Sequence, residues 1–130
     1  MPTIAEFHHV HVPVSDVLTS RDWYSAVLGF APLLDFEEED ELVGVALCHP
    51  AGITIWISHD PDRAAVMRGF DIVSLSVADR PQLDEWLVHL DALGIEHTPV
   101  TGGHPGWTMD VMDPDGIHVR FRTPEQPSTG

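Results

Sequence analysis

Residues 7–30, FHHVHVPVSDVLTSRDWYSAVLGF, combine a two-faced strand with a capped amphipathic helix. Successive side chains of a strand point to opposite faces, so imidazole and aliphatic groups separate here. One face carries Phe7, His9 and His11, and the other carries His8, Val10, Val12 and Val14. The aliphatic face is expected to pack on a helix, and the imidazole face to line a cavity or meet water.

The helix that follows has a start signal and a stop signal. Asp16 is placed to cap the first turn by accepting a hydrogen bond from a free backbone amide. Apolar residues then recur at helical spacing, namely Trp23, Tyr24, Val27 and Leu28, before Gly29 supplies the stop. The stretch therefore predicts a strand, a tight connection and a helix.

The same order returns in the second half, where residues 70–79 stand in the place of residues 7–16. Val73, Leu75 and Val77 make an aliphatic face, while Ile72, Ser74 and Ser76 make the other. Asp79 is a second cap and Gly94 a second stop. The caps at 16 and 79 lie 63 positions apart, and the stops at 29 and 94 lie 65 apart, which indicates a duplication.

Each predicted helix is followed by three apolar runs that read as strands. They span residues 31–36, 42–48 and 53–58 in the first half, and 95–100, 107–112 and 117–122 in the second. Asp113-Pro114-Asp115-Gly116 is a strong turn signal before the last run. We predict one domain over residues 1–130, with module one at about 5–59, a linker at 60–69 and module two at 70–123.

The composition limits the classes of partner. Six arginines, no lysine and 21 acidic residues give a formal net charge of −15, which argues against nucleic acid. Such a surface attracts cationic ligands, or serves solubility alone. The single Cys48 excludes a disulfide within the chain, and no signal peptide or membrane segment is visible, so we expect a cytoplasmic protein with no membrane partner.

These motifs together resemble the vicinal oxygen chelate superfamily, which includes glyoxalases, extradiol dioxygenases and the fosfomycin- and bleomycin-resistance proteins. The resemblance rests on residues 9–16, on the helix end Trp23-Tyr24 to Leu28-Gly29-Phe30, and on Asp113 to Gly116, and it extends from about residue 7 to 121. It implies an α+β fold of two tandem βαβββ modules. Their strands would form a cupped mixed sheet with helices outside and a small-molecule ligand inside, often in a homodimer.

The resemblance also implies where a metal would bind in metal-dependent members. The four corresponding positions here are His9, Trp56, Ile72 and Arg120, of which only His9 can coordinate an ion. The charge of Arg120 would oppose a cation at that place. We therefore expect no metal and no other cofactor, although a nonstandard site made by His9, His11 and His118 stays open as an alternative.

A metal-free pocket with an arginine at the carboxylate position is similar to the bleomycin-resistance branch, whose members sequester a cationic drug with an aromatic tail. We expect a metal-independent small-molecule-binding protein that acts in drug sequestration or antibiotic resistance, with a cationic or aromatic ligand. The candidate ligand-binding residues are His9, His11, Trp56, Ser74, Trp107, His118 and Arg120.

Several alternatives stay open at this point. Both tryptophans can be core residues, and Arg120 can form an ion pair with a nearby acidic residue instead of binding a ligand. Asp110 and His104 are expected near the mouth of the pocket. The alternative function is an enzyme of the same fold. It would be a lyase or dioxygenase with a relocated metal, or a metal-free isomerase or cyclase using His9 or His11 as acid and base.

Overall fold

The computed structural model describes residues 1–102 and 106–124. The chain divides into two compact units, residues 1–63 (unit one) and residues 64–130 (unit two), and each is described by itself. Across the described ranges, no helix is both long enough and apolar enough to cross a membrane.

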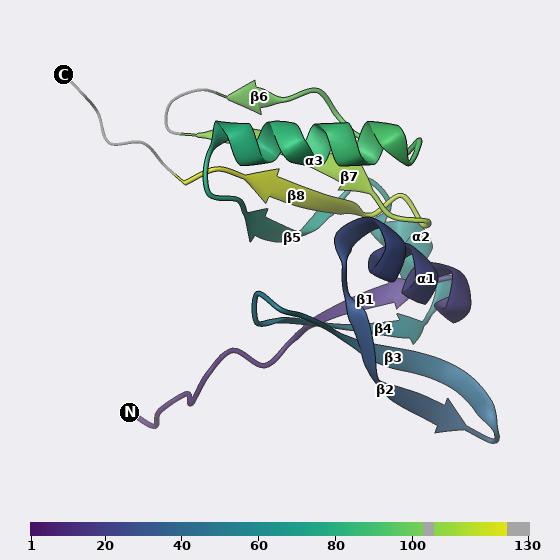
Figure 1. Cartoon of the computed structure of the whole chain (residues 1–130). Coiled ribbons are helices and arrows are strands. Elements are labelled where there is room, and N and C mark those ends of the chain that lie inside the picture. Colours follow the sequence, from purple (N-terminus) through teal and green to yellow (C-terminus); the bar gives the residue numbers. More distant parts are fainter. Residues whose placement is uncertain (103–105, 125–130) are drawn as a thin grey trace. The chain divides into compact units, whose positions relative to one another are not determined.

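Unit one contains one helix and four strands. They are β1 (Val10–Val14), α1 (Val17–Leu28), β2 (Ala31–Glu38), β3 (Glu41–His49) and β4 (Ile53–His59). The sheet order is β1-β4-β3-β2, with β1 parallel to β4 and the other pairs antiparallel. Figure 1 shows the long β2–β3 hairpin, whose two-residue turn at Glu39 and Asp40 has positive φ at both positions, as hairpin twist requires.

Unit two repeats this plan. The short helix α2 (Pro61–Met67) leads into β5 (Asp71–Ser76), α3 (Arg80–Ala92), β6 (Thr101–Gly102), β7 (Trp107–Met112) and β8 (His118–Arg122). The sheet order is β5-β8-β7-β6, with β5 parallel to β8. In both units the first strand pairs with the last strand, and a helix follows the first strand. The predicted α+β fold of two tandem βαβββ modules is therefore confirmed.

Side-chain caps begin both long helices, as predicted. The Oδ1 atom of Asp16 accepts a hydrogen bond from the amide of Thr19 at 2.9 Å, and Oδ1 of Asp79 accepts one from the amide of Gln82 at 3.0 Å. At the other end of α1, Gly29 has φ of 81°, a left-handed conformation that glycine adopts without a steric penalty.

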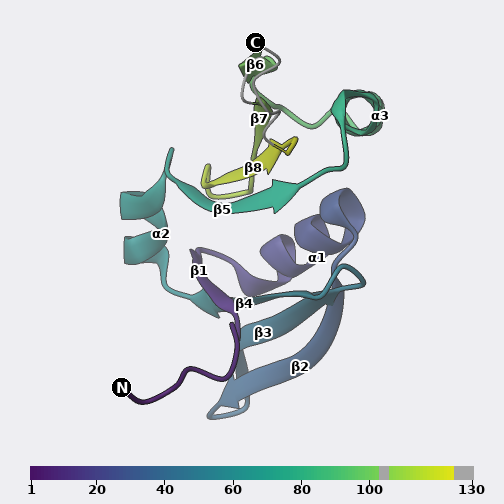
Figure 2. The same cartoon turned by 90° about the vertical axis from the view of Figure 1, so that its left-hand side faces the viewer.

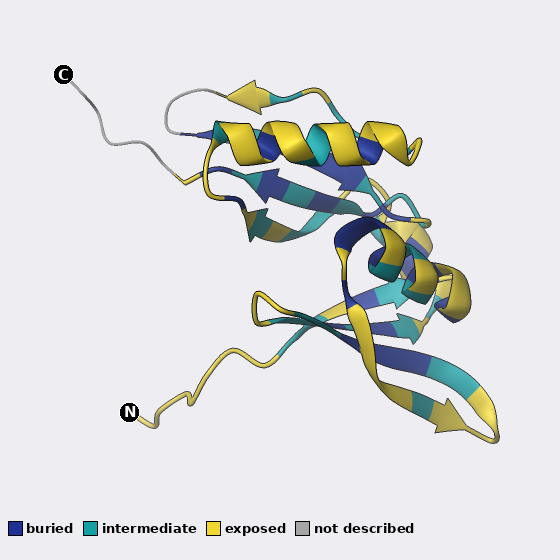
Figure 3. Cartoon of the chain, in the orientation of Figure 1, coloured by how far each residue is buried: buried dark blue, intermediate teal, exposed yellow. Residues whose placement is uncertain are grey.

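In each unit the helix covers one face of the sheet. In unit one, α1 packs across β3 and β4, and Val12, Ile55 and Ile57 are fully buried beneath it (Figure 2). In unit two, the ring of Trp86 on α3 lies 4.6 Å from that of Phe121 on β8. Figure 3 shows buried and less buried residues alternating along β8. The opposite face carries His11 and Trp56 in unit one, and Ser74, His118 and Arg120 in unit two.

Two strands, β1 and β6, depart furthest from their predicted bounds. β1 begins at Val10, so residues 7–9 lie before the strand. The run 95–100 is not a continuous strand, and β6 contains only Thr101 and Gly102. His97 instead forms an isolated bridge with Val111 of β7. The next pairing is interrupted, because the amide of Asp110 donates its hydrogen bond to the hydroxyl of Thr98 at 2.8 Å instead of to a backbone carbonyl.

The segment predicted as a linker, residues 60–69, contains the helix α2. Its start has the signals of a helix: Pro61 is the first helical residue, and Oδ1 of Asp60 accepts a hydrogen bond from the amide of Arg63 at 3.2 Å. Because α2 has a single buried residue, Ala64, it has no apolar periodicity from which its helical state can be predicted.

Replacing Asp16 by alanine is expected to lower the free energy of unfolding by about 1 kcal/mol, because the amide of Thr19 loses its partner. Urea unfolding followed by circular dichroism measures the change. Asp22→Ala, which removes an equal charge from an exposed position of α1, is the matched control and should change stability by less than half as much. Equal losses in the two variants would show that the cap contributes nothing.

Candidate functional site

The open face of the unit one sheet is centred on Trp56. This residue lies on β4 between His11 of β1 and Ala46 of β3, its direct neighbours in the strand register. The ring of His9 stacks on the indole with a centroid distance of 3.9 Å and an angle of 10°. Phe36 of β2 approaches the indole to 5.0 Å. We call His9, Trp56 and Phe36 the Trp56 cluster.

Gly44 gives Phe36 its place in this cluster. The two residues are register partners on β3 and β2. A Cβ atom at Gly44 would lie 2.7 Å from the carbonyl oxygen of Ile57 and 3.4 Å from Cδ2 of Phe36. A side chain at position 44 would therefore separate the strands or displace the phenyl ring, and the cluster depends on glycine there.

The imidazoles of unit one bond to one another and to a hydroxyl. Nδ1 of His8 lies 2.9 Å from Nδ1 of His9, and Nε2 of His11 lies 2.7 Å from Oγ of Ser58. Desolvation, followed by repulsion from His8 and His11, lowers the pKa of His9 below its usual 6.5. A neutral His9 ring thus lies on the indole at neutral pH. In the described part of the chain, neither His9 nor His11 is hydrogen-bonded to a carboxylate that would orient it as a catalytic base.

A pocket of about 600 Å³ adjoins the Trp56 cluster. Its lining consists of Glu6, Phe7, His8, Leu33, Leu34, Ala46, Gly52, Thr54 and Trp56. Large apolar side chains on its wall are exposed, with Phe7 at 72% and Leu33 at 66%. The volume lies in the range of small-molecule pockets, and an aromatic floor with exposed apolar walls suits an apolar ring.

The open face of the unit two sheet carries an ion-pair network. Ser74 on β5, Arg120 on β8 and Asp110 on β7 lie side by side in the register. Nε and Nη2 of Arg120 donate to the two carboxylate oxygens of Asp110 at 2.8 and 3.2 Å, and Nη1 lies 3.3 Å from Oδ2 of Asp71. Nδ1 of His118 lies 2.9 Å from Oδ2 of Asp110. Arg120 is therefore held by two carboxylates of its own unit.

Burial and hydrogen bonding act in opposite directions on Asp110, which is only 7% exposed. Desolvation alone would raise its pKa, but hydrogen bonds from Arg120 and His118 outweigh this, so the pKa of Asp110 lies below its usual 3.8. The hydrogen bond to Asp110 also raises the pKa of Arg120. Both groups are fully charged at neutral pH. Asp110 was expected near a pocket mouth and is instead buried within this network.

Trp107 lies on the other face of the unit two sheet. It alternates with Thr108 and shares its side of β7 with Met109, which is buried opposite Phe121 under α3. The guanidinium carbon of Arg80 on α3 lies 4.6 Å from the centre of the indole. Trp107 and Arg120, both predicted to bind a ligand, lie on opposite faces of this sheet, because strand alternation puts the sheet between them.

The predicted site residues thus fall into three places. His9, His11 and Trp56 come together in unit one, and Ser74, His118 and Arg120 come together in unit two. Trp107 also belongs to unit two, but it lies on the helix-covered face of the sheet, under Arg80. His104 lies outside the described residues.

Comparisons with known proteins place this fold in a family. The family model described as "Glyoxalase/Bleomycin resistance protein/Dioxygenase superfamily" matches residues 6–121. The chain belongs to this superfamily. A comparison with curated protein sequences found no match.

Solved structures of the superfamily fold align over nearly the whole chain. A glyoxylase/bleomycin resistance protein/dioxygenase domain from Frankia sp. EAN1pec is 21% identical, with a TM-score of 0.77 and coverage of 97% of this chain and 96% of that one. The genomically encoded fosfomycin resistance protein FosX from Listeria monocytogenes is 15% identical (TM-score 0.76; 93% and 94% covered). TnmS3, an antibiotic binding protein from Streptomyces sp. CB03234, is 22% identical (TM-score 0.73; 94% and 99% covered). At these identities the likeness shows the fold.

The four residues that the resemblance assigns to the superfamily's metal positions do not fit a divalent ion. Trp56 and Ile72 have no donor atoms for it. Arg120 is a permanent cation, already bound by Asp110 and Asp71. The ring of His9 is stacked on Trp56. Within residues 1–102 and 106–124, no group of three or more His, Cys, Asp or Glu side chains is arranged to hold a metal ion.

Two residues around Trp56 were not predicted: Phe36, which contacts the indole, and His8, which lines the adjoining pocket. Asp110 was expected near a pocket mouth, but its contacts with Arg120 and His118 were not predicted. For Asp110 a usable signal existed. The turn at residues 113–116 pairs Met112 with His118, and counting back two positions on each strand places Asp110 opposite Arg120.

Replacing Asp110 by asparagine is expected to lower the free energy of unfolding at pH 7 by about 2 kcal/mol. Asparagine has the same shape as aspartate, but Arg120 and His118 lose their negatively charged acceptor. Because folding lowers the pKa of Asp110, this stabilisation is present above pH 3.8 and disappears as the pH falls further. Urea unfolding of both proteins from neutral to acidic pH measures the difference.

Asp84→Asn is the matched control for Asp110→Asn. It breaks the exposed ion pair with Arg80 on α3, which is expected to cost less than about 0.5 kcal/mol. If the two substitutions destabilise the protein equally, or if the effect of Asp110→Asn does not shrink in acid, the buried network does not have the role described.

Proposed function

We propose that this protein is a metal-independent small-molecule-binding protein that acts in drug sequestration or antibiotic resistance. In this proposal a planar aromatic cation binds in the pocket of unit one and stacks on the Trp56 cluster. The observation that carries it is the half-buried indole of Trp56 on an open sheet face, with aromatic neighbours at 3.9 and 5.0 Å and a pocket of about 600 Å³ beside it.

The side chains of the pocket favour a flat guest over an aliphatic one. Indole, phenyl and imidazole rings offer stacking surfaces, and base-sized rings gain about 1–3 kcal/mol from such stacking in other proteins. His9 belongs to the segment before β1, so its ring can leave the indole without breaking a strand pair. The ring of the ligand would then stack on Trp56 in the place of the His9 ring.

Charge supports a cationic guest. The chain has a formal net charge of −15, and Glu6 lines the pocket itself. At the tip of the β2–β3 hairpin of the same unit, Glu37, Glu38 and Glu41 are exposed. The negative field draws cations toward the face, and a cation over an indole gains a further contribution from the ring.

Metal independence rests on the donor set. Among the residues at the four family positions, His9, Trp56, Ile72 and Arg120, only the His9 imidazole can coordinate a metal ion. Arg120 adds a permanent positive charge. The antibiotic-binding relative TnmS3 has the same fold and supports sequestration as a role for it.

The test uses 9-aminoacridine, a planar aromatic cation, titrated into protein treated with EDTA and followed by calorimetry. We expect saturable binding that Trp56→Leu weakens about tenfold or more, since the stacking surface is lost. Trp107→Leu is the matched control, because Trp107 lies on the helix-covered face of unit two, and it should leave the affinity unchanged.

Two further arms separate the parts of the proposal. Anthracene-9-carboxylate has a similar ring system and the opposite charge, so it should bind more weakly than 9-aminoacridine. Adding zinc or manganese back should not change binding. Equal affinity in both tryptophan variants would contradict the site, and binding that requires the divalent ion would contradict metal independence.

A further inference from the structure

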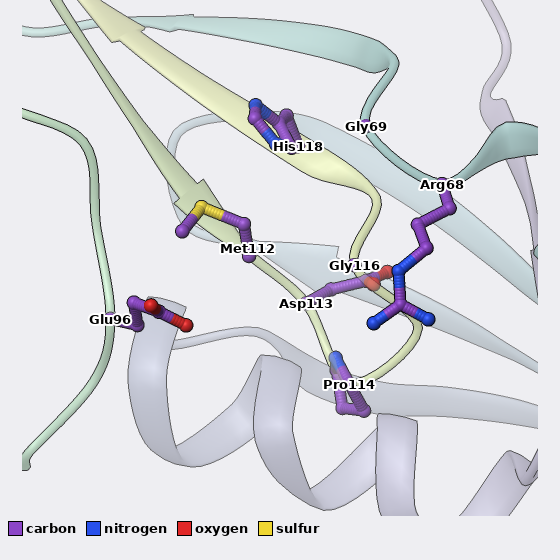
Figure 4. Close-up of a pocket in the computed structure, with 8 residues that line it drawn as sticks. All are labelled: Arg68, Gly69, Glu96, Met112, Asp113, Pro114, Gly116 and His118. Carbon is purple, nitrogen blue, oxygen red and sulfur yellow. The ribbon is translucent and has the colours of Figure 1, made fainter.

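A second pocket, of about 390 Å³, lies at the β7–β8 turn within unit two (Figure 4). Its polar wall contains the guanidinium of Arg68, the carboxylates of Glu96 and Asp113, and the imidazole of His118. Met112 and Pro114 add apolar surface. All of its lining residues belong to unit two, and its chemical character differs from that of the Trp56 cluster, because hydrogen-bonding groups replace aromatic rings.

Arg68 is a cation without a partner in the described ranges, where no side-chain hydrogen bond or ion pair reaches it. This is unusual in a chain with 21 acidic residues and six arginines. Arginines 21, 63, 80 and 120 each pair with an aspartate. A guanidinium left unpaired beside a pocket is suited to bind a carboxylate through two parallel hydrogen bonds.

The backbone holds Arg68 in this position. Its side chain lies against Gly116, where an added Cβ would come within 3.0 Å of Cγ of Arg68. Gly116 has φ of 76°, and its carbonyl accepts a hydrogen bond from the amide of Gly69 at 2.8 Å. The glycine therefore serves both the turn and the close approach of the arginine, as Figure 4 shows.

His118 presents one defined nitrogen to ligands. The carboxylate of Asp110 is ionised and can only accept hydrogen bonds, so Nδ1 of His118 carries the proton in their 2.9 Å contact. Arg120 fixes the same carboxylate from the other side. In the neutral ring Nε2 is then an acceptor, and it has no hydrogen-bond partner in the described part of the chain.

We propose that this pocket binds a small hydroxycarboxylate, whose carboxylate pairs with Arg68 and whose hydroxyl donates a hydrogen bond to Nε2 of His118. Glu96 on the wall repels a second negative charge, so monocarboxylates are preferred over dicarboxylates. Oδ1 of Asp113, on the same wall, accepts hydrogen bonds from the amides of Asp115 and Ile117.

The net negative charge of the chain does not prevent this binding. At physiological ionic strength the charges of distant exposed groups are screened over about 8 Å, so the groups in the pocket determine the local field. Long-range repulsion lowers the association rate of an anion, whereas its contacts with Arg68 and His118 determine the dissociation rate.

The experiment is a two-dimensional NMR titration that follows the backbone amide signals of Gly69 and Gly116 in every variant, and also the ring signals of His118 wherever that residue is present. The ligands are straight-chain hydroxycarboxylates with a terminal hydroxyl, from glycolate to 4-hydroxybutyrate, and the corresponding carboxylates without it, from acetate to butyrate. We expect at least one hydroxycarboxylate to bind about tenfold or more tightly than its partner lacking the hydroxyl, because the analogue leaves Nε2 unpaired. Equal affinities within every pair would overturn the proposal.

Variants assign the two contacts. Arg68→Met should abolish binding of both ligand series, and Arg63→Met, which removes an equal charge from an exposed position on α2, should change neither. His118→Phe should remove the preference for the hydroxyl while carboxylate binding persists. If His118→Phe does not fold, the comparison of ligand pairs in the unmodified protein still decides. Binding that survives Arg68→Met, or no saturable shift with any ligand, would refute the site. Trp56→Leu should leave these titrations unaltered.

Discussion

The packing of one helix on one aliphatic sheet face is the constraint on which the rest of each unit depends. Val12, Ile55 and Ile57 in unit one, and Val111, Val119 and Phe121 in unit two, are buried because they alternate inward along their strands. Alternation then turns every second residue to the opposite face. The Trp56 cluster and the Arg120–Asp110–His118 network lie on the uncovered faces for this reason.

Much of the fold follows from local signals. Asp16 and Asp79 are caps because a carboxylate can accept from free amides in the first turn, and the turn at residues 113–116 sets the register of β7 with β8. These features need only neighbouring residues, so the sequence is sufficient to predict them. The helix α2 is an exception, since seven residues with one buried side chain carry no usable period.

The sites were harder to predict because they depend on contacts between strands. His9, His11 and Trp56 were predicted by residue type and alternation, and the structure brings them together in unit one. Trp107 was predicted from its residue type alone, and its three-residue spacing from Asp110, which puts the two side chains on opposite faces, was not used. The role of Arg68 depends on the approach of Gly116 from a segment 48 positions away, which no local pattern reports.

The parallel pairing of each unit's first strand with its last also determines when a unit can close. Val10 meets Ile55 and Val73 meets Val119, so β1 and β5 remain unpaired until the final strand of their module has left the ribosome. The β2–β3 and β7–β8 hairpins need no such delay. During synthesis, β1 therefore stays unpaired until nearly the whole of its module has been made. A chain stopped before Ile53 lacks β4, the strand with which β1 pairs.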